Sequence, residues 1–309
     1  MGFETELIKL VRNAADRDSP DWLAVGPGDD AAAVTLEHAE TLVVTTDMVV
    51  EGVHFRPETP SAAVAHKAMA RCISDLAAMA ARPLCSVAAL KMGQETPESR
   101  HRELMETLPA AARELSAPLI GGDVGSGDGA LVLTVTGIGV EGPAGLVRRN
   151  GARPGDAICV TGRLGGSIRG RHLEFRPRVK EALELVELAD VHALIDISDG
   201  LSTDLLHIAD ESDVGVEVEA GRIPISPDAV ELSRESGHIS LWHALNDGED
   251  YELLFCLSPQ EARQVEERGL EGLEVTIIGR VTEDGNRYLI SENGKRSQLH
   301  AEGWEHTTQ

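Results

Sequence analysis

The chain has 309 residues, with 28 Lys and Arg against 52 Asp and Glu, so its formal net charge is −24. Carboxylates in this excess repel nucleic-acid phosphates and anionic lipid headgroups, which argues against a nucleic-acid binder and against a protein that binds membrane surfaces. With 42% hydrophobic residues the chain is too apolar for an acidic disordered protein, and its length fits two domains of roughly 150 residues each.

The cysteines and the start of the chain carry no pattern of export or membrane anchoring. The four cysteines, Cys72, Cys85, Cys159 and Cys256, form no C-x-x-C pair, so we expect free thiols in a reducing cytoplasm. The first residues lack the basic and then apolar pattern of a secretory signal. Nowhere do about 18 apolar residues follow one another, so the sequence predicts no membrane-spanning helix.

In the first half of the chain, the hydrophobic pattern predicts helices and short strands. Apolar residues recur at helical spacing over residues 4–15, which predicts an amphipathic helix there. The alanine-rich stretch 62–81 predicts a long buried helix, and the β-branched residues of 130–140 predict a long strand. The other elements predicted for this half are a helix at 97–116 and strands at 31–36, 41–46, 86–92 and 118–120.

Residues 141–155 contain the densest group of turn-forming residues, with glycine and arginine clustered together. We place a domain boundary in this segment, which gives domains of residues 1–147 and 148–309. The elements expected in the second domain are strands at 157–161, 214–218, 253–257, 273–280 and 288–291, a short apolar segment at 193–197, and helices at 177–189, 201–211, 227–236 and 259–267. Because strands and helices mix without strict βαβ alternation, the predicted fold class is α+β.

The most informative feature is a recurring pattern in which an apolar run ends at Gly, Ser or Thr followed by Asp. It occurs in residues 25–30, 42–47, 73–75, 119–123 and 194–200, and a sixth acidic turn at 246–251 precedes a predicted strand. Small residues let a backbone or a ligand approach closely, and carboxylates at the ends of elements can meet in one cleft. Because such carboxylates repel one another unless a hard cation neutralises them, the pattern favours oxygen-ligated Mg²⁺, which commonly bridges the phosphates of a nucleotide.

A structural explanation of the same pattern stays open. A single Asp at such a position is more often a turn residue or a helix N-cap than a metal ligand, and Ser198 or Asp199 is well placed to cap the helix predicted at 201–211. The common nucleotide motifs are missing, since the sequence contains neither G-x-x-x-x-G-K-[ST] nor a G-x-G-x-x-G that follows a strand. The glycine-rich loop 162–167 has the composition to cradle a phosphate, although a plain turn is its commoner role.

Seven short motifs lie in order along the chain: GPGDD at 26–30, TTD at 45–47, EGVHF at 51–55, SDLAAM at 74–79, GGD at 121–123, DISDG at 196–200 and GEDYEL at 248–253. Their order and spacing resemble those of the thiamine-monophosphate kinase family, and the resemblance extends from residue 4 to residue 304. As an ordered set the motifs are highly specific, although no single tripeptide among them is.

The resemblance implies the fold of aminoimidazole ribonucleotide synthetase, in which an N-terminal α/β domain pairs its sheet across a homodimer and a C-terminal α+β domain follows. It also implies direct transfer of the γ-phosphoryl group of ATP to thiamine phosphate. The implied Mg²⁺ ligands are Asp30, Thr45, Thr46, Asp47, Asp75, Asp123, Asp196 and Asp199. The implied ATP contacts are Gly122, Asp123, Arg149 and Ser198, the implied thiamine phosphate contacts are His54, Glu249 and Trp304, and the implied catalytic residues are Asp47, Asp75, Asp123 and Arg149.

The residues fit direct transfer without reference to the family. A phosphate monoester has a second pKa of about 6, so at neutral pH the acceptor is mostly an oxyanion already and needs no general base. The choice between Arg148 and Arg149 as a phosphate contact rests only on the alignment of residues 150–155, which favours Arg149. Many relatives carry an aromatic residue before the GGD motif, where this chain has RELS at 113–116, so the adenine pocket stays open. The alternatives are another ATP-dependent enzyme of the same superfold, similar to aminoimidazole ribonucleotide synthetase, and a non-catalytic nucleotide or thiamine-phosphate sensor.

Overall fold

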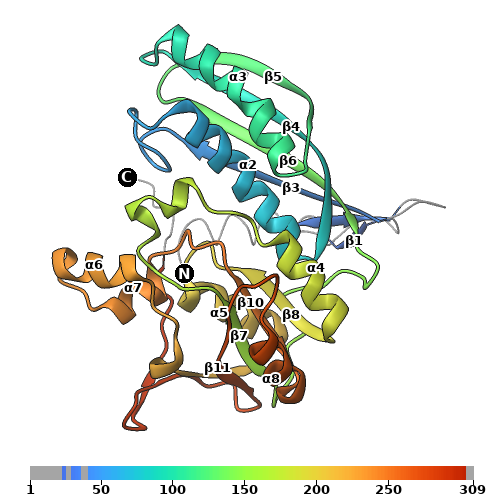
Figure 1. Cartoon of the computed structure of the whole chain (residues 1–309), viewed down its shortest axis with the longest axis vertical. Coiled ribbons are helices and arrows are strands. Elements are labelled where there is room, and N and C mark those ends of the chain that lie inside the picture. The colour runs from blue at the N-terminus through green and yellow to red at the C-terminus, as the bar shows by residue number, and fades with distance from the viewer. Residues whose placement is uncertain (1–22, 26–28, 36–40, 304–309) are drawn as a thin grey trace.

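The computed structural model describes residues 23–25, 29–35 and 41–303, which form two β-sheets with helices packed against them (Figure 1). The helix expected at 4–15 and the expected substrate contact Trp304 lie outside the described residues. The four cysteines are free thiols. Among the described residues, no helix is long and apolar enough to cross a membrane.

The first sheet has six strands in the order β1-β2-β3-β6-β4-β5, and β4 and β5 pair in parallel while the other neighbours are antiparallel. Two helices, α2 (Ser61–Ala78) and α3 (Glu98–Glu114), pack on each other and on this sheet. The strands are β1 (Leu23–Val25), β2 (Ala32–Val34), β3 (Leu42–Val50), β4 (Ala81–Gly93), β5 (Leu119–Gly127) and β6 (Val132–Glu141). Alanines let α2 approach the sheet closely, and its apolar side chains share one core cluster with β3 and β6.

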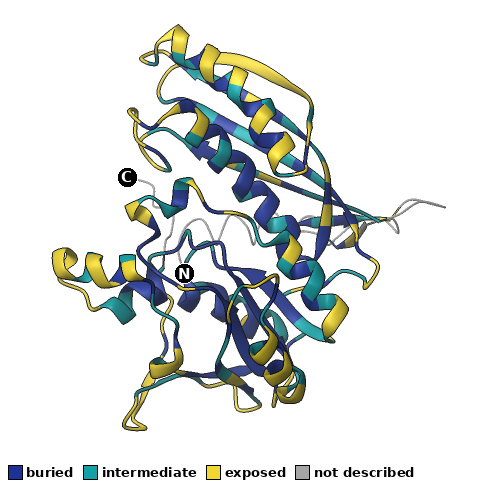
Figure 2. Ribbon diagram, in the orientation of Figure 1, coloured by how far each residue is buried: buried dark blue, intermediate teal, exposed yellow. Residues whose placement is uncertain are grey.

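Strand β5 is longer than the sequence predicts and is exposed along most of its length (Figure 2). The expected strand at 118–120 continues to Gly127 because it pairs in parallel with β4. Glycine-rich sequences have low β-propensity, so the hydrogen bonds to β4 hold this segment in a strand. At Gly122 an added Cβ would lie 2.1 Å from the Ala88 carbonyl oxygen, so only glycine fits this approach. Ile120 and Val124 are 65% and 50% exposed, which leaves an uncovered apolar surface on this strand.

The second sheet has seven strands in the order β13-β12-β9-β11-β7-β10-β8, and its pairing is antiparallel except between β9 and β12. Its strands are β7 (Ala157–Thr161), β8 (Val191–Asp196), β9 (Gly215–Glu219), β10 (Leu253–Leu257), β11 (Val275–Thr282), β12 (Arg287–Ile290) and β13 (Arg296–Gln298). The accompanying helices are α4 (Val179–Leu188), α5 (Leu201–Ser212), α6 (Pro227–Ser236), α7 (Ser240–Asn246) and α8 (Pro259–Arg268), with short 3₁₀ turns η2 (Ser167–Arg169), η3 (Arg171–Leu173) and η4 (Ala220–Arg222). These mixed, largely antiparallel sheets confirm the α+β class. The sequence did not predict α7, which is short, or β13, which is entirely exposed.

Helix α2 joins the two halves of the molecule. Besides β3 and β6 of the first sheet, it contacts β8 and α4 of the second half, and Figure 1 shows it lying between the first sheet and α4. Ala77 and Ala80, at the end of this helical region, share a core cluster with Cys159 and Phe255 of the second sheet. Polar side chains on α2 can therefore meet partners from both halves. The proposed domain boundary near residue 148 falls between β6 and β7.

Candidate functional site

One face of α2 carries polar side chains at helical spacing. Lys67, Arg71 and Asp75 follow one another at intervals of four residues, and Ser74 precedes Asp75, so the four project from the same side of the helix. The partners of Lys67, Arg71, Ser74 and Asp75 are, in that order, Glu249, Asp47, Asp196 and Thr45. Because these partners come from both sheets and from the loop before β10, this face of α2 organises the site.

At the C-terminal end of this face, the carboxylates of Asp75 and Asp196 lie close together. Thr45 Oγ1 on β3 donates a hydrogen bond to Asp75 Oδ2 at 2.5 Å. Ser74 Oγ donates to Oδ2 of Asp196, the last residue of β8, at 2.5 Å. Residues of β3, α2 and β8, three elements that are far apart in sequence, therefore converge here.

The carboxylates at this end repel one another. Burial, followed by the charges of Asp196 and Asp47, holds the pKa of Asp75 well above its usual range. Burial also raises the pKa of Asp196, and it raises the pKa of Asp30 to about 7 although Arg149 opposes that shift. Oδ2 of Asp30 is buried and accepts no hydrogen bond from the described residues. Clustered carboxylates of this kind, one with an oxygen that lacks a donor, fit a hard divalent cation.

Of the two adjacent arginines, Arg149 is the one that reaches these carboxylates. Its Nη2 lies 2.6 Å from Asp30 Oδ1, and its Nε lies 3.5 Å from Asp29 Oδ1. Arg148 instead donates from Nη2 to the carbonyl oxygen of Ala24 at 2.8 Å. The geometry therefore agrees with the choice of Arg149 that the alignment favours.

The N-terminal end of the α2 face holds a buried lysine. Lys67 is 0% exposed, its Nζ lies 2.6 Å from Glu249 Oε1, and it donates to the carbonyl oxygen of His54 at 2.7 Å. The His54 ring is fixed as well, because the Val50 N–H donates to Nδ1 at 3.0 Å and leaves the proton of the neutral ring on Nε2. Lys67, which the sequence analysis left without a role, thus joins two of the expected substrate contacts.

The turn that carries Glu249 is held against the DISDG motif. The Glu249 N–H donates to the Ser198 carbonyl at 2.7 Å, and the Tyr251 N–H donates to the Ile197 carbonyl at 2.8 Å. Both Glu249 and Tyr251 have positive φ angles, 53° and 51°, which cost backbone energy and persist only where the surroundings impose them. The Tyr251 ring also stacks on Phe175 with 3.8 Å between ring centroids. The acidic turn at 246–251 is therefore a rigid part of the site.

At the start of α5, Ser198 and Asp199 do not act as helix caps. The N-cap residue is Gly200, and the backbone N–H groups of Ser198 and Asp199 both donate to Asp204 Oδ2 at 3.1 Å. The N-cap explanation of these two residues is therefore wrong. Oxygens of Asp199 and Asp204 and a ring nitrogen of His207 lie within 4.8 Å of one another, so Asp204 and His207 belong to this region although no motif pointed to them.

Gly122 and Asp123 are not brought to the carboxylates within one chain. Asp123 on β5 pairs with Ala89, Ala89 pairs with Thr134, and Thr134 pairs with Met48 on β3. Three strand spacings of about 4.8 Å place β5 roughly 14 Å from β3. Within one chain, Gly122 and Asp123 therefore lie too far from the carboxylates to share a nucleotide or a cation with them directly.

Two further expected residues differ in placement. The Thr46 side chain points to the sheet face opposite Thr45, where its Oγ1 lies 3.0 Å from Thr136 Oγ1, so only its main chain faces the carboxylates. Trp304 lies outside the described residues. The residue before it, Gly303, packs on Asp199, since an added Cβ there would lie 1.9 Å from the Asp199 carbonyl oxygen.

Arg71 is another residue of this site that the sequence analysis missed. Its Nε donates to Asp47 Oδ2 at 2.9 Å, and its side chain is 17% exposed. The available signal was the spacing of Lys67, Arg71 and Asp75 in a helix that is otherwise largely apolar. Such cations are usually solvated, and only the docking of the second half of the chain covers these two.

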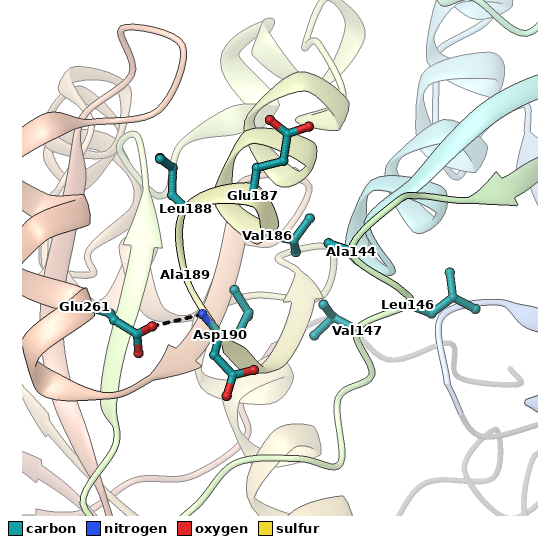
Figure 3. Close-up of a pocket in the computed structure, with 10 residues that line it drawn as sticks. Ala144, Leu146, Val147, Val186, Glu187, Leu188, Ala189, Asp190 and Glu261 are labelled. Atoms are coloured by element: carbon teal, nitrogen blue, oxygen red, sulfur yellow. Dashed lines mark hydrogen bonds between the residues drawn. The ribbon is translucent and has the colours of Figure 1, made fainter.

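A pocket of about 450 Å³ lies elsewhere, between loop 144–147 and the end of α4. Figure 3 shows Val186 and Val147 along its wall and the hydrogen bond from the Asp190 N–H to Glu261, which measures 3.1 Å. None of the expected site residues lines this pocket. The polar face of α2, not this pocket, is therefore the candidate functional site.

The chain is similar in sequence and fold to known proteins. Family models for the N-terminal and C-terminal domains of AIR synthase related protein match residues 28–140 and 127–291. The chain is similar to the thiamine-monophosphate kinases of Rhodopirellula baltica, with 37% identity covering 92% of each chain, and of Escherichia coli, with 34% identity covering 97% of each. The solved structure of AaThiL complexed with AMPPCP and TMP matches with a TM-score of 0.82 and 27% identity, covering 98% of this chain and 97% of that one.

Proposed function

The chain belongs to the thiamine-monophosphate kinase family, and we propose that it transfers the γ-phosphoryl group of ATP to thiamine phosphate, with thiamine diphosphate and ADP as products. The single observation that best supports this is the arrangement along α2. Along the row of polar side chains from Lys67 to Asp75, carboxylates that fit a divalent cation lie at the Asp75 end, and the His54–Lys67–Glu249 group lies at the Lys67 end. A metal–polyphosphate site thus lies beside a separate polar site for an acceptor.

We propose Mg²⁺ as the cation. The support is physical: burial and mutual repulsion raise the pKa of Asp75, and one buried oxygen of Asp30 has no donor among the described residues. When bound, Mg²⁺ would neutralise the phosphates and hold the γ-phosphoryl group in place. The proposed side-chain ligands are Asp30, Thr45, Asp47, Asp75, Asp196 and Asp199.

The protein's own contribution to the reaction is to hold two anions in line. Arg149, now paired with Asp30, offers a guanidinium group to the phosphates of ATP, and Ser198 lies at the adjoining turn. His54 offers the Nε2 proton and Glu249 a carboxylate to the acceptor. Since thiamine phosphate is already an oxyanion at neutral pH, no side chain has to remove a proton from it.

We propose that the protein acts as a homodimer through the exposed face of the first sheet. The strand register places Met48 on β3 on the same face of the sheet as Asp123 on β5. Met48 is 51% exposed, and exposed apolar surface of this kind marks an interaction site. If a second copy packs on this face, Gly122 and Asp123 of one copy can contact nucleotide bound at the carboxylates of the other copy. Met48→Asp is expected to yield inactive monomers in analytical ultracentrifugation and assay, whereas a fully active monomer would contradict the proposal.

A coupled assay of ADP release tests the proposed reaction. Thiamine phosphate, thiamine and an aminoimidazole ribonucleotide precursor are offered as alternative acceptors with ATP and Mg²⁺. We expect ADP release with thiamine phosphate, accompanied by thiamine diphosphate. Release with the precursor alone would make the chain an enzyme of the aminoimidazole ribonucleotide synthetase type. Nucleotide binding without release for any acceptor would favour the sensor.

A further inference from the structure

The polar face of α2 places Arg71 between the two parts of the proposed site. Lys67, Arg71 and Asp75 occupy successive turns of the helix, and a rise of about 1.5 Å per residue separates neighbours in this row by about 6 Å along the axis. The first of them contacts the proposed acceptor residues, and the last contacts the proposed metal ligands. A phosphoryl group that is transferred from the metal-binding part to the acceptor part must therefore pass close to Arg71.

Arg71 carries a charge and has donors to spare at this position. The guanidinium group of an arginine stays protonated at physiological pH, and that of Arg71 lies against the Asp47 carboxylate. Among the described residues, the hydrogen bond that Arg71 makes runs from Nε to Asp47 Oδ2 at 2.9 Å. Within residues 23–25, 29–35 and 41–303, no group accepts a hydrogen bond from Nη1 or Nη2. These two nitrogens form the fork that binds two phosphate oxygens at once.

Lys67 cannot serve in the same way. It is completely buried, and its ammonium group is occupied by Glu249 Oε1 at 2.6 Å and the His54 carbonyl at 2.7 Å. Arg149, the other guanidinium at the carboxylates, is paired with Asp30, away from this acceptor group. Of these three cations, Arg71 is the one that faces both Glu249 and Asp47 with donors in reserve.

We propose that Arg71 binds the phosphate of thiamine phosphate through Nη1 and Nη2 and thereby selects the phosphorylated acceptor over thiamine. This rests on the proposed function and adds to it the residue that recognises the acceptor's phosphate. Its Nε hydrogen bond to Asp47 keeps the guanidinium plane fixed, so little side-chain entropy is lost when the phosphate binds. The recognised feature is the dianionic phosphate, which thiamine lacks.

Calorimetric titration of the nucleotide-free protein with thiamine phosphate and with thiamine tests the assignment. The wild type is expected to bind thiamine phosphate more tightly than thiamine. In Arg71→Met that preference should fall by roughly 10- to 100-fold, the equivalent of one charged hydrogen-bond pair, with little change in the affinity for thiamine. Arg71→Lys, which keeps the charge and loses the fork, should recover part of the preference. Arg102→Met, at an exposed arginine of α3, is the matched control.

Several outcomes separate this assignment from other roles. An unchanged preference in Arg71→Met overturns it, and so does loss of ATP binding with the preference intact, which would mean that Arg71 only positions Asp47. Arg71→Gln, measured alongside, retains a hydrogen-bond donor and keeps the test in force if the methionine variant is unstable. A wild type that binds neither thiamine compound contradicts the proposed function itself.

Discussion

The two ends of the polar face of α2 differ in how their charges are balanced. At the N-terminal end, the ammonium group of Lys67 is neutralised by Glu249 inside the protein. At the C-terminal end, Asp75 and Asp196 have hydroxyl donors as partners, and burial raises the pKa of both. One end therefore balances its charges within the protein, whereas the other end leaves repelling carboxylates that the proposed Mg²⁺ would neutralise.

Replacing Asp75 by Asn breaks the cation-demanding end and has the largest expected effect. Turnover should fall by about 10³-fold or more, because a ligand to the catalytic cation is lost. The metal-free variant should melt at the same temperature as the wild type or higher, since a repelling charge is removed. Steady-state kinetics and calorimetric melting measure the two effects.

The matched control for Asp75→Asn is Asp190→Asn, at a carboxylate that is 77% exposed. It should leave both turnover and melting temperature unchanged. A variant of Asp75 that keeps a tenth of the wild-type turnover would remove this residue from the proposed metal ligands.

Replacing Lys67 by Met breaks the preassembled end. We expect a loss of about 3 kcal/mol in the free energy of unfolding, at the low end of the range for broken buried ion pairs because Glu249 is 25% exposed. The KM for thiamine phosphate should rise while the KM for ATP changes little. Urea unfolding and kinetics measure these effects.

The double variant Lys67→Met/Glu249→Gln sharpens the same point. Removing the carboxylate that Lys67→Met leaves unpaired should restore part of the lost stability. If Lys67→Met alone costs less than about 1 kcal/mol, the ion pair is not a fixed part of the site.

The smallest expected effect concerns pH at the acceptor end. Burial, followed by the charge of Lys67, lowers the pKa of His172 below 6.5, and its Nδ1 lies 2.9 Å from the Ser167 carbonyl oxygen. The folded protein therefore prefers the neutral ring. Its contribution is fully present above about pH 6.5 and is lost as the pH falls through the lowered folded pKa. His172→Gln should make the free energy of unfolding less sensitive to acid between about pH 7.5 and pH 5, by less than about 1 kcal/mol. Equal acid sensitivity of wild type and variant in urea unfolding would show that His172 does not contribute.

The convergence of the carboxylates could be predicted from sequence because it depends on local signals. Asp75 and Asp196 each follow Ser or an apolar run in the recurring pattern, which left a shared metal site and a turn or cap role both open, and the resemblance of the ordered motifs to a known family then implied one shared site. His54 and Glu249 were expected as thiamine phosphate contacts because the resemblance implies that role. The contacts of Lys67 with both residues could not be predicted, because the sequence of a helix does not show which segment will pack over a lysine on it.

Long-range pairing accounts for the other differences. The extension of β5 to Gly127 depends on its ladder with β4, which its own glycine-rich sequence does not favour. Asp123 was grouped with the other ligands because motif order carries no information about how far apart the strands of a sheet lie. Asp204 lies inside α5, outside any turn motif, and became visible only when the loop before that helix was seen to donate to it.

A single-turnover reaction with ATP labelled at the γ-phosphate tests the central claim most directly. Enzyme in excess over labelled ATP is mixed with Mg²⁺ and thiamine phosphate, and the reaction is stopped over a time course. If the two ends of α2 hold the substrates side by side, the label passes from ATP to thiamine diphosphate with none bound to protein. A labelled protein that forms and decays at the rate of product formation would contradict direct transfer across this site.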